Sequence, residues 1–171
     1  MVRQCKCEKT IFYYQRDKRW AKEIMTQASW TDTIGEFGCL VTCLTNIIQV
    51  LMGKKFMPKD LNDIFVQDRA YKYLEDRNTP ENIASVLIWD KVQKLFSAID
   101  FKLFLKDYKE DSKAYYIGEL AGRFHFVNVL AVKPGYYDRI NYICYDVWDG
   151  QIRLYCKEDF DYFHVLKLKG V

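Results

Sequence analysis

The sequence has little of several features that mark specialised protein classes. Its 171 residues include only 8 glycines and 3 prolines, too few for a collagen-like or low-complexity chain. No apolar run approaches the roughly 20 residues that a membrane-spanning helix needs. The polar residues 1–9 contain no apolar stretch of the kind found in a secretory signal. These absences predict a cytoplasmic protein without a membrane span.

Charge of one sign is also scarce. The chain has 26 Lys and Arg against 23 Asp and Glu, a net charge of +3, and its longest basic runs are pairs such as Lys54-Lys55. A nucleic-acid surface needs concentrated basic residues, so we expect no nucleic-acid partner. Apolar residues, in contrast, make up 50% of the chain and aromatic residues 16%, which excludes disorder over most of its length. We expect a loose polar tail at residues 1–10 and a single domain over residues 11–171.

Six cysteines are the next feature to explain. A chain of this length does not need disulfide staples, so we interpret them as reduced thiols. Cys5-x-Cys7 is half of a possible zinc site, but no second Cys or His pair at zinc-ligand spacing follows it. We therefore expect no metal and no cofactor, and the chemistry must lie in individual cysteines: Cys5, Cys7, Cys39, Cys43, Cys144 and Cys156.

The spacing of apolar residues changes along the chain. Steps of three and four from Cys39 to Leu51 predict a helix that ends at Gly53. A second helix is predicted to begin at Pro58, and a third to cover Ala84–Ile99. The later sequence favours short strands, which predicts the α+β class, with helices first and an antiparallel sheet second. We expect a loop at residues 26–38 and strands at residues 102–105, 114–117, 124–132, 139–147, 152–156 and 162–168.

Cys39 is the strongest nucleophile candidate because it stands where a loop enters the predicted helix. The free N–H groups and the positive end of the dipole at a helix N-terminus favour a thiolate and can stabilise an oxyanion beside it. Gly38, having no side chain, would let a substrate backbone approach closely. Cys43, one turn later on the apolar stripe, fits a structural core residue.

A nucleophilic cysteine needs a base, and the chain has only two histidines, His125 and His164. A hairpin turn centred on Gly135 and Tyr136 would place His125 directly opposite Asp146. Directly opposed side chains project to the same side of a sheet, so Asp146 could orient the imidazole and stabilise its protonated form. A bulge could shift this register. His164 has no such partner, and we interpret it as structural.

Six segments that follow one another along the chain carry a family resemblance. They are Tyr14–Ala21 (YQRDKRWA), Thr33–Thr42 (TIGEFGCLVT), Pro58–Asn62 (PKDLN), Trp89–Val92 (WDKV), His125–Val129 (HFVNV) and Tyr145–Gly150 (YDVWDG). This ordered set resembles the C39-like peptidase family, whose members are similar to papain-like cysteine peptidases, with Val147 where the family pattern has Pro.

The resemblance implies a papain-like fold, with N-terminal helices packed on a C-terminal antiparallel sheet. It implies Cys39 as nucleophile, His125 as general base and acid, and Asp146 as the residue that orients His125. Gln15 would donate its side-chain N–H to the oxyanion hole, together with the backbone N–H of Cys39. The implied reaction is hydrolysis of an amide bond in a peptide or protein substrate through a thioester acyl-enzyme.

Two other functions fit the same residues. The chain could be a catalytically silent module that uses a peptidase fold to bind peptides, although a degraded site usually loses a member of the catalytic set. It could instead transfer the acyl group to an amine in place of water, as in peptide ligation or transglutamination.

Overall fold

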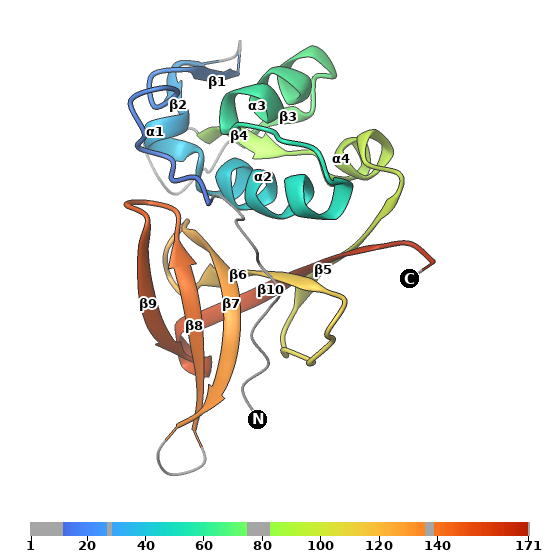
Figure 1. The fold of residues 1–171 in the computed structure, drawn as a ribbon. Coiled ribbons are helices and arrows are strands. Elements are labelled where there is room, and N and C mark those ends of the chain that lie inside the picture. Colours follow the sequence, from blue (N-terminus) through green and yellow to red (C-terminus); the bar gives the residue numbers. More distant parts are fainter. Residues whose placement is uncertain (1–11, 27–28, 75–82, 136–138, 171) are drawn as a thin grey trace.

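The computed structural model describes residues 12–26, 29–74, 83–135 and 139–170 (Figure 1). Helices predominate in the first half of the chain, together with two small antiparallel hairpins. In order, these elements are β1 (Ile24–Thr26), β2 (Ser29–Thr33), α1 (Ile34–Phe37), α2 (Cys39–Met52), α3 (Pro58–Gln67), β3 (Tyr71–Leu74), β4 (Ile83–Leu87) and α4 (Trp89–Leu95). β1 pairs with β2, and β3 pairs with β4.

The second half of the chain forms a six-stranded antiparallel sheet, which gives the molecule a mixed α+β structure. Its strands lie in the order β5-β10-β6-β7-β8-β9, so β10 sits between two strands that precede it in the sequence. The elements are β5 (Ile99–Leu105), β6 (Tyr115–Leu120), β7 (Phe126–Pro134), β8 (Ile140–Asp146), β9 (Gln151–Cys156), the short 3-10 helix η2 (Lys157–Asp159) and β10 (Phe160–Leu168).

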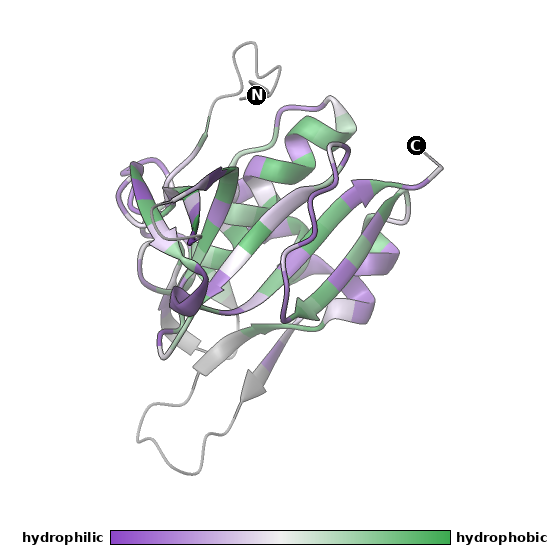
Figure 2. Ribbon diagram, turned by 90° about the horizontal axis from the view of Figure 1, so that it is seen from below, coloured by the Kyte–Doolittle hydropathy of each residue, from purple (hydrophilic) through white to green (hydrophobic). Residues whose placement is uncertain are grey.

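The main core lies between the helical layer and the sheet (Figure 1). α2 contributes the longest buried stripe because its apolar residues recur on one face, and Leu44 and Ile48 on that face have no exposed surface. From the sheet, Ile117 and Leu166 join the same cluster. Figure 2 shows the corresponding alternation of apolar and polar residues along the strands. Burial of this shared face joins the two layers.

A smaller apolar cluster lies on the curved part of the sheet. Val127 of β7, Cys144 of β8 and Phe163 of β10 form it together with Leu120 and Tyr142. All five are buried, and the aromatic rings of Tyr142 and Phe163 pack at 5.4 Å between centroids. This second cluster fixes the positions of β7 and β8 relative to each other, so the ends of both strands are held in place.

The segment before β1 is anchored by its large aromatic residues. Tyr13 and Trp20 are buried and pack edge to face at 5.3 Å between ring centroids. Trp20 also donates its indole N–H to the backbone oxygen of Tyr14 at 3.0 Å. In addition, the side chain of Asn46 in α2 accepts from the N–H of Tyr13 and donates to its carbonyl oxygen. The chain around Gln15 is thus fixed against α2.

Several predicted elements are confirmed, and two are wrong. The helices beginning at Cys39 and at Pro58 are present, and Gly53 ends the first of them in the left-handed conformation that glycine tolerates. The third predicted helix, Ala84–Ile99, divides into strand β4 and helix α4, because Leu87 and its neighbours pair with β3. The predicted loop at 26–38 instead contains β2 and α1.

Some expectations concern residues that the structure does not describe: the tail 1–10, with Cys5-x-Cys7, and the turn after Gly135. Within the described ranges, no helix has the length and apolar character required to span a bilayer. The same part of the chain holds no group of three or more His, Cys, Asp or Glu side chains placed to hold a metal ion.

Candidate active site

Cys39 is the first residue of α2, and its side chain is 7% exposed. The helix starts there because α1 ends at Phe37 and Gly38 turns the chain, donating its N–H to the carbonyl oxygen of Ile34. A Cβ on Gly38 would lie 2.5 Å from that oxygen. The expectation that Gly38 admits a substrate backbone is therefore replaced by a packing reason, since Ile34 already occupies the space.

His125 lies directly before β7 and contacts two of the predicted partners. Its Nε2 donates to Oδ1 of Asp146 at 2.7 Å. The thiol of Cys39 is close enough to the same ring to raise its pKa, and since Nε2 faces Asp146, Nδ1 is the ring nitrogen left for the thiol. The Cys39 sulfur lies 3.7 Å from the backbone oxygen of Phe124 as well. One imidazole therefore joins a thiol on a helix to a carboxylate on the sheet.

The predicted strand register is wrong, although the predicted contact is present. Val127, not His125, lies opposite Asp146, and the register shifts again between Val129 and Ala131. His125 precedes Val127 by two residues, so it lies on the same side of the sheet as Val127 and diagonal to Asp146. Long side chains still reach each other across such a diagonal. Because the observed register differs from the predicted one by two residues, an even number, His125 and Asp146 stay on the same side of the sheet.

Two buried asparagines hold β7 against α2 below the site. Asn128 of β7 donates to the backbone oxygen of Cys43 at 3.1 Å and accepts from the amide of Asn46 at 2.9 Å. Both side chains are almost fully buried, so these bonds replace the water that the amides lost. Asn128 follows His125 by only three residues. This network therefore fixes the position of His125 relative to Cys39.

The surroundings of His125 favour its protonated form. Burial, the largest single influence, lowers the pKa, but the hydrogen bonds with Asp146 and Cys39 and the charges of the same groups together raise it to about 9. An imidazole with that pKa is protonated at neutral pH. The arrangement is that of an imidazolium held between a carboxylate and a thiol.

Asp146 is held by more donors than the sequence indicates. Its Oδ1 accepts from the backbone N–H of Trp148, and its Oδ2 contacts Arg153 at 2.9 Å and the hydroxyl of Tyr155 at 3.3 Å. Burial raises the pKa of this carboxyl, but the bonds from His125 and Trp148 and the charges of His125 and Arg153 outweigh that effect and lower it. Asp146 is therefore ionised and fixed in orientation.

Arg153 and Trp148 are neighbours of the site that sequence reasoning missed. Arg153 also bridges to Asp149 at 2.6 Å. The Asp149-Gly150 pair, which is typical of a tight turn, is the sequence signal that could have indicated this neighbour, since such a turn brings Arg153 close to Asp146. Trp148 packs perpendicular to the His125 ring, at 6.2 Å between centroids. Its position in the segment Tyr145–Gly150 was the corresponding signal.

Gln15 is bonded both to the chain that follows Asp146 and to the helix that precedes Cys39. Its backbone N–H donates to the carbonyl oxygen of Val147 at 2.7 Å, directly after Asp146. Its side-chain Nε2 donates to the carbonyl oxygen of Gly35 at 3.1 Å, in the helix that leads to Cys39. The residue is fully buried, and its Oε1 has no hydrogen-bond partner. The segment therefore folds back onto α1, the helix that precedes Cys39, and one N–H of the amide remains for another acceptor.

The remaining candidates are placed in structural surroundings. His164 is buried, with Nε2 3.3 Å from Glu119 and its ring stacked on Trp89 at 5.5 Å between centroids. Cys43 and Cys144 are fully buried, and burial raises the pKa of both thiols. A thiol with a raised pKa is a poor nucleophile at neutral pH, so Cys43 and Cys144 fit structural roles.

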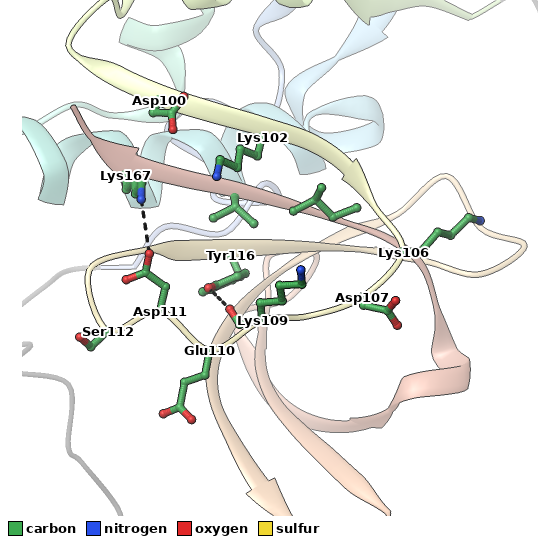
Figure 3. Close-up of a pocket in the computed structure, with 12 residues that line it drawn as sticks. Asp100, Lys102, Lys106, Asp107, Lys109, Glu110, Asp111, Ser112, Tyr116 and Lys167 are labelled. Atoms are coloured by element: carbon green, nitrogen blue, oxygen red, sulfur yellow. Dashed lines mark hydrogen bonds and ion pairs between the residues drawn. The ribbon is translucent and has the colours of Figure 1, made fainter. Parts of the chain in front are cut away.

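A cavity of about 730 Å³ lies elsewhere on the molecule, against β5, β6 and β10 (Figure 3). Lysines and carboxylates alternate around it, and Lys167 pairs with Asp111 across part of it at 3.5 Å. None of the four candidate site residues lines this cavity. Its mixed charges select neither an anion nor a cation, so we assign the chemistry to the Cys39 region.

Comparisons with protein-family models, with curated proteins and with solved structures find no match to this chain.

Proposed function

We propose that this chain is a cysteine peptidase of the C39-like, papain-like type, which hydrolyses an amide bond in a peptide or protein substrate. The observation that carries the proposal is the position of one imidazole between a carboxylate and a thiol. His125 bonds Asp146 through Nε2 at 2.7 Å, and the thiol of Cys39 at the start of α2 is close enough to the same ring to raise its pKa. A structural histidine needs neither a thiol at a helix N-terminus nor a buried carboxylate behind it.

The proposed reaction proceeds in two halves. Cys39 reacts as the thiolate of a thiolate–imidazolium pair, in which His125 already holds the proton, and the sulfur attacks the carbonyl carbon of the substrate. His125 then gives that proton to the departing amine, which leaves a thioester between the substrate acyl group and Cys39. Water, deprotonated by His125, hydrolyses the thioester and restores the thiol. Asp146 keeps the imidazole in the orientation that both proton transfers require.

Gln15 is proposed as the side-chain donor to the oxyanion. The carbonyl oxygen of the substrate becomes negative during each attack, and fixed N–H groups stabilise it without reorganising. The amide of Gln15 is buried and aligned by its bond to Gly35. The backbone N–H of Cys39, in the first turn of α2, is the second proposed donor.

A reducing compartment such as the cytoplasm suits this scheme, because the thiol of Cys39 must stay unoxidised to act. The four cysteines within the described ranges are all free thiols: Cys39, Cys43, Cys144 and Cys156.

The test compares the wild-type chain with Cys39→Ala and with Cys43→Ser. Wild type should cleave bonds in a peptide library and should react with iodoacetamide at Cys39 much faster than an ordinary thiol near neutral pH. Cys39→Ala should lose turnover yet remain folded. Cys43→Ser should lose stability but keep the chemistry, because Cys43 lies in the core. Retained hydrolysis in Cys39→Ala would exclude this nucleophile.

Two outcomes would favour the alternative functions. Slow labelling of Cys39 without cleavage would indicate a peptide-binding module. Fast labelling with products that appear only when an amine is added would indicate acyl transfer, since the amine then replaces water in the second half of the reaction.

A further inference from the structure

Arg16 extends beside the candidate site and has no carboxylate partner among the residues that the structure describes. Its guanidinium carbon lies 3.6 Å from the centre of the Trp148 ring, and the side chain is exposed. Gln15 precedes Arg16, and Val147 precedes Trp148. The N–H of Gln15 donates to the oxygen of Val147, so the two backbones are paired next to the stack. Backbone pairing, and not only the stacking itself, therefore holds Arg16 and Trp148 together.

The nearest carboxylates in the sequence are bound to other arginines. Asp17, the next residue, accepts from Arg19 at 2.7 Å, and Asp149, which follows Trp148, is bound by Arg153 at 2.6 Å. Within the described ranges, Arg16 forms no ion pair. Stacking fixes the plane of a guanidinium and leaves the N–H groups at its edge available for hydrogen bonds. The spacing of these N–H groups matches the two oxygens of a carboxylate.

The position of Trp148 indicates which part of a substrate would meet Arg16. The Trp148 ring packs perpendicular to the ring of His125, at 6.2 Å between centroids. In the proposed reaction, His125 protonates the departing amine, so the amine portion of the substrate lies next to His125. A substrate chain that continues from His125 toward Trp148 would reach Arg16, because Trp148 contacts both residues.

We propose that Arg16 binds a carboxylate in the amine portion of the substrate, and so determines specificity on that side of the scissile bond. This inference rests on the proposed peptidase function. The carboxylate has two possible sources, the side chain of an Asp or Glu residue and the free C-terminus of a short peptide, and both offer the same bidentate acceptor. The stack on Trp148 would pre-order the guanidinium and reduce the entropic cost of binding.

The first test needs no substrate. Two alkylating probes, 4-(iodoacetamido)benzoate and the matching benzamide, differ only in the charge at the end remote from the reacting carbon. Wild type should react with the benzoate about 10-fold faster than with the benzamide, and Arg16→Gln should lose this preference. Arg16→Glu should reverse it. Lys18→Gln, which removes an exposed charge two residues away, should leave the preference unchanged.

The outcomes of this test separate the two proposals. If the neutral benzamide labels Cys39 no faster than an ordinary thiol, the peptidase function is overturned, and this inference falls with it. If the benzamide labels Cys39 fast but the two probes react equally in wild type and in Arg16→Gln, the inference about Arg16 alone is overturned.

The second test uses two peptide libraries to identify the source of the carboxylate. One library has amidated C-termini and contains Asp and Glu; the other lacks acidic residues and has free C-termini. Mass spectrometry of the cleaved products should show enrichment of acidic residues after the cut in the first library, or of cuts near the C-terminus in the second. Arg16→Gln should remove that enrichment while cleavage continues. Cleavage by wild type without either enrichment overturns the inference.

Discussion

Among single residues, Asp146 has the most partners in the candidate site, because its carboxylate accepts from four donors. Oδ1 accepts from His125 and from the N–H of Trp148, while Oδ2 accepts from Arg153 and from the hydroxyl of Tyr155. Charged hydrogen bonds of this kind are short and directional. The carboxylate is therefore held from both oxygens, and the imidazole that it orients has little freedom to turn.

The first residue-scale prediction concerns pH. In the proposed reaction His125 must be protonated to release the amine, and its pKa is about 9, so kcat/KM should fall as pH rises through about 9. Asp146→Asn removes the charge that raises this pKa, while burial continues to lower it, so the fall should occur at a lower pH. A pH profile of kcat/KM measures the shift, and Asp149→Asn is the matched control. An unchanged profile in Asp146→Asn would contradict the assignment.

The same pKa shift affects stability. The folded-state pKa of His125 is raised from 6.5 to about 9, so the folded state binds the proton more tightly than the unfolded state does. The stabilisation should be fully present below pH 6.5 and should be lost as pH rises through about 9. Thermal unfolding of wild type and His125→Gln across this range measures it: the difference in Tm should shrink with rising pH. A difference that stays constant would show that the proton does not contribute.

The third residue-scale prediction concerns Gln15. Gln15→Ala should lower the acylation rate about 10²-fold with little change in substrate binding, as the loss of one oxyanion donor does. Alkylation forms no oxyanion, so Cys39 should still react with iodoacetamide at its normal rate. Gln67→Ala, on the exposed end of α3, serves as control. Loss of labelling together with hydrolysis would show instead that Gln15 holds the segment in place.

At the scale of elements, the junction of α1 and α2 sets the position of the nucleophile. Gly38→Ala would bring a Cβ to 2.5 Å from the oxygen of Ile34, so the two helices must separate. We expect a loss of about 1–3 kcal/mol in stability and a fall in kcat, because Cys39 moves with α2. Gly122→Ala is a useful control: Gly122 has φ +63 with open space around it, so its variant should lose stability but keep kcat. Equal kcat in both variants would contradict this account.

How far the sequence predicts the elements depends on what supports each one. α2 could be predicted because its own apolar period runs from Cys39 onward. The segment from Ile83 could not, because Ile83–Leu87 is a strand only through its pairing with Tyr71–Leu74, a contact that the local pattern does not contain. Short apolar runs fit a buried helix or a strand equally well.

In the candidate site, too, contacts that follow from a sequence period could be predicted, and contacts that depend on distant segments could not. His125 and Asp146 could be matched from the sequence because side chains alternate with a period of two, so a register error of an even number of residues leaves them on one side. The contact between Gln15 and Gly35, in contrast, depends on the anchoring of Tyr13 by Asn46. Side-chain bonds between distant segments have no sequence period, so no pattern could have predicted them.

At the scale of the whole molecule, the site lies where the helical layer meets the sheet. Cys39 belongs to α2, while Asp146 belongs to β8, and one apolar core contains residues of both layers. We therefore expect activity and secondary structure to be lost at the same denaturant concentration. Parallel titrations of turnover and far-UV circular dichroism measure this. Loss of activity well before the dichroism signal would show that the layers separate without unfolding.

The place of β10 in the sheet also has a consequence for biosynthesis. Among the described residues, the strand partner of β5 (Ile99–Leu105) is β10 (Phe160–Leu168), which also pairs with β6. On a ribosome, β5 therefore waits for more than fifty further residues to be translated before its partner strand emerges. The thiol, the imidazole and the carboxylate are all translated earlier, but the sheet that carries two of them cannot close. If the proposed function holds, a nascent chain would thus remain without peptidase activity until β10 leaves the exit tunnel.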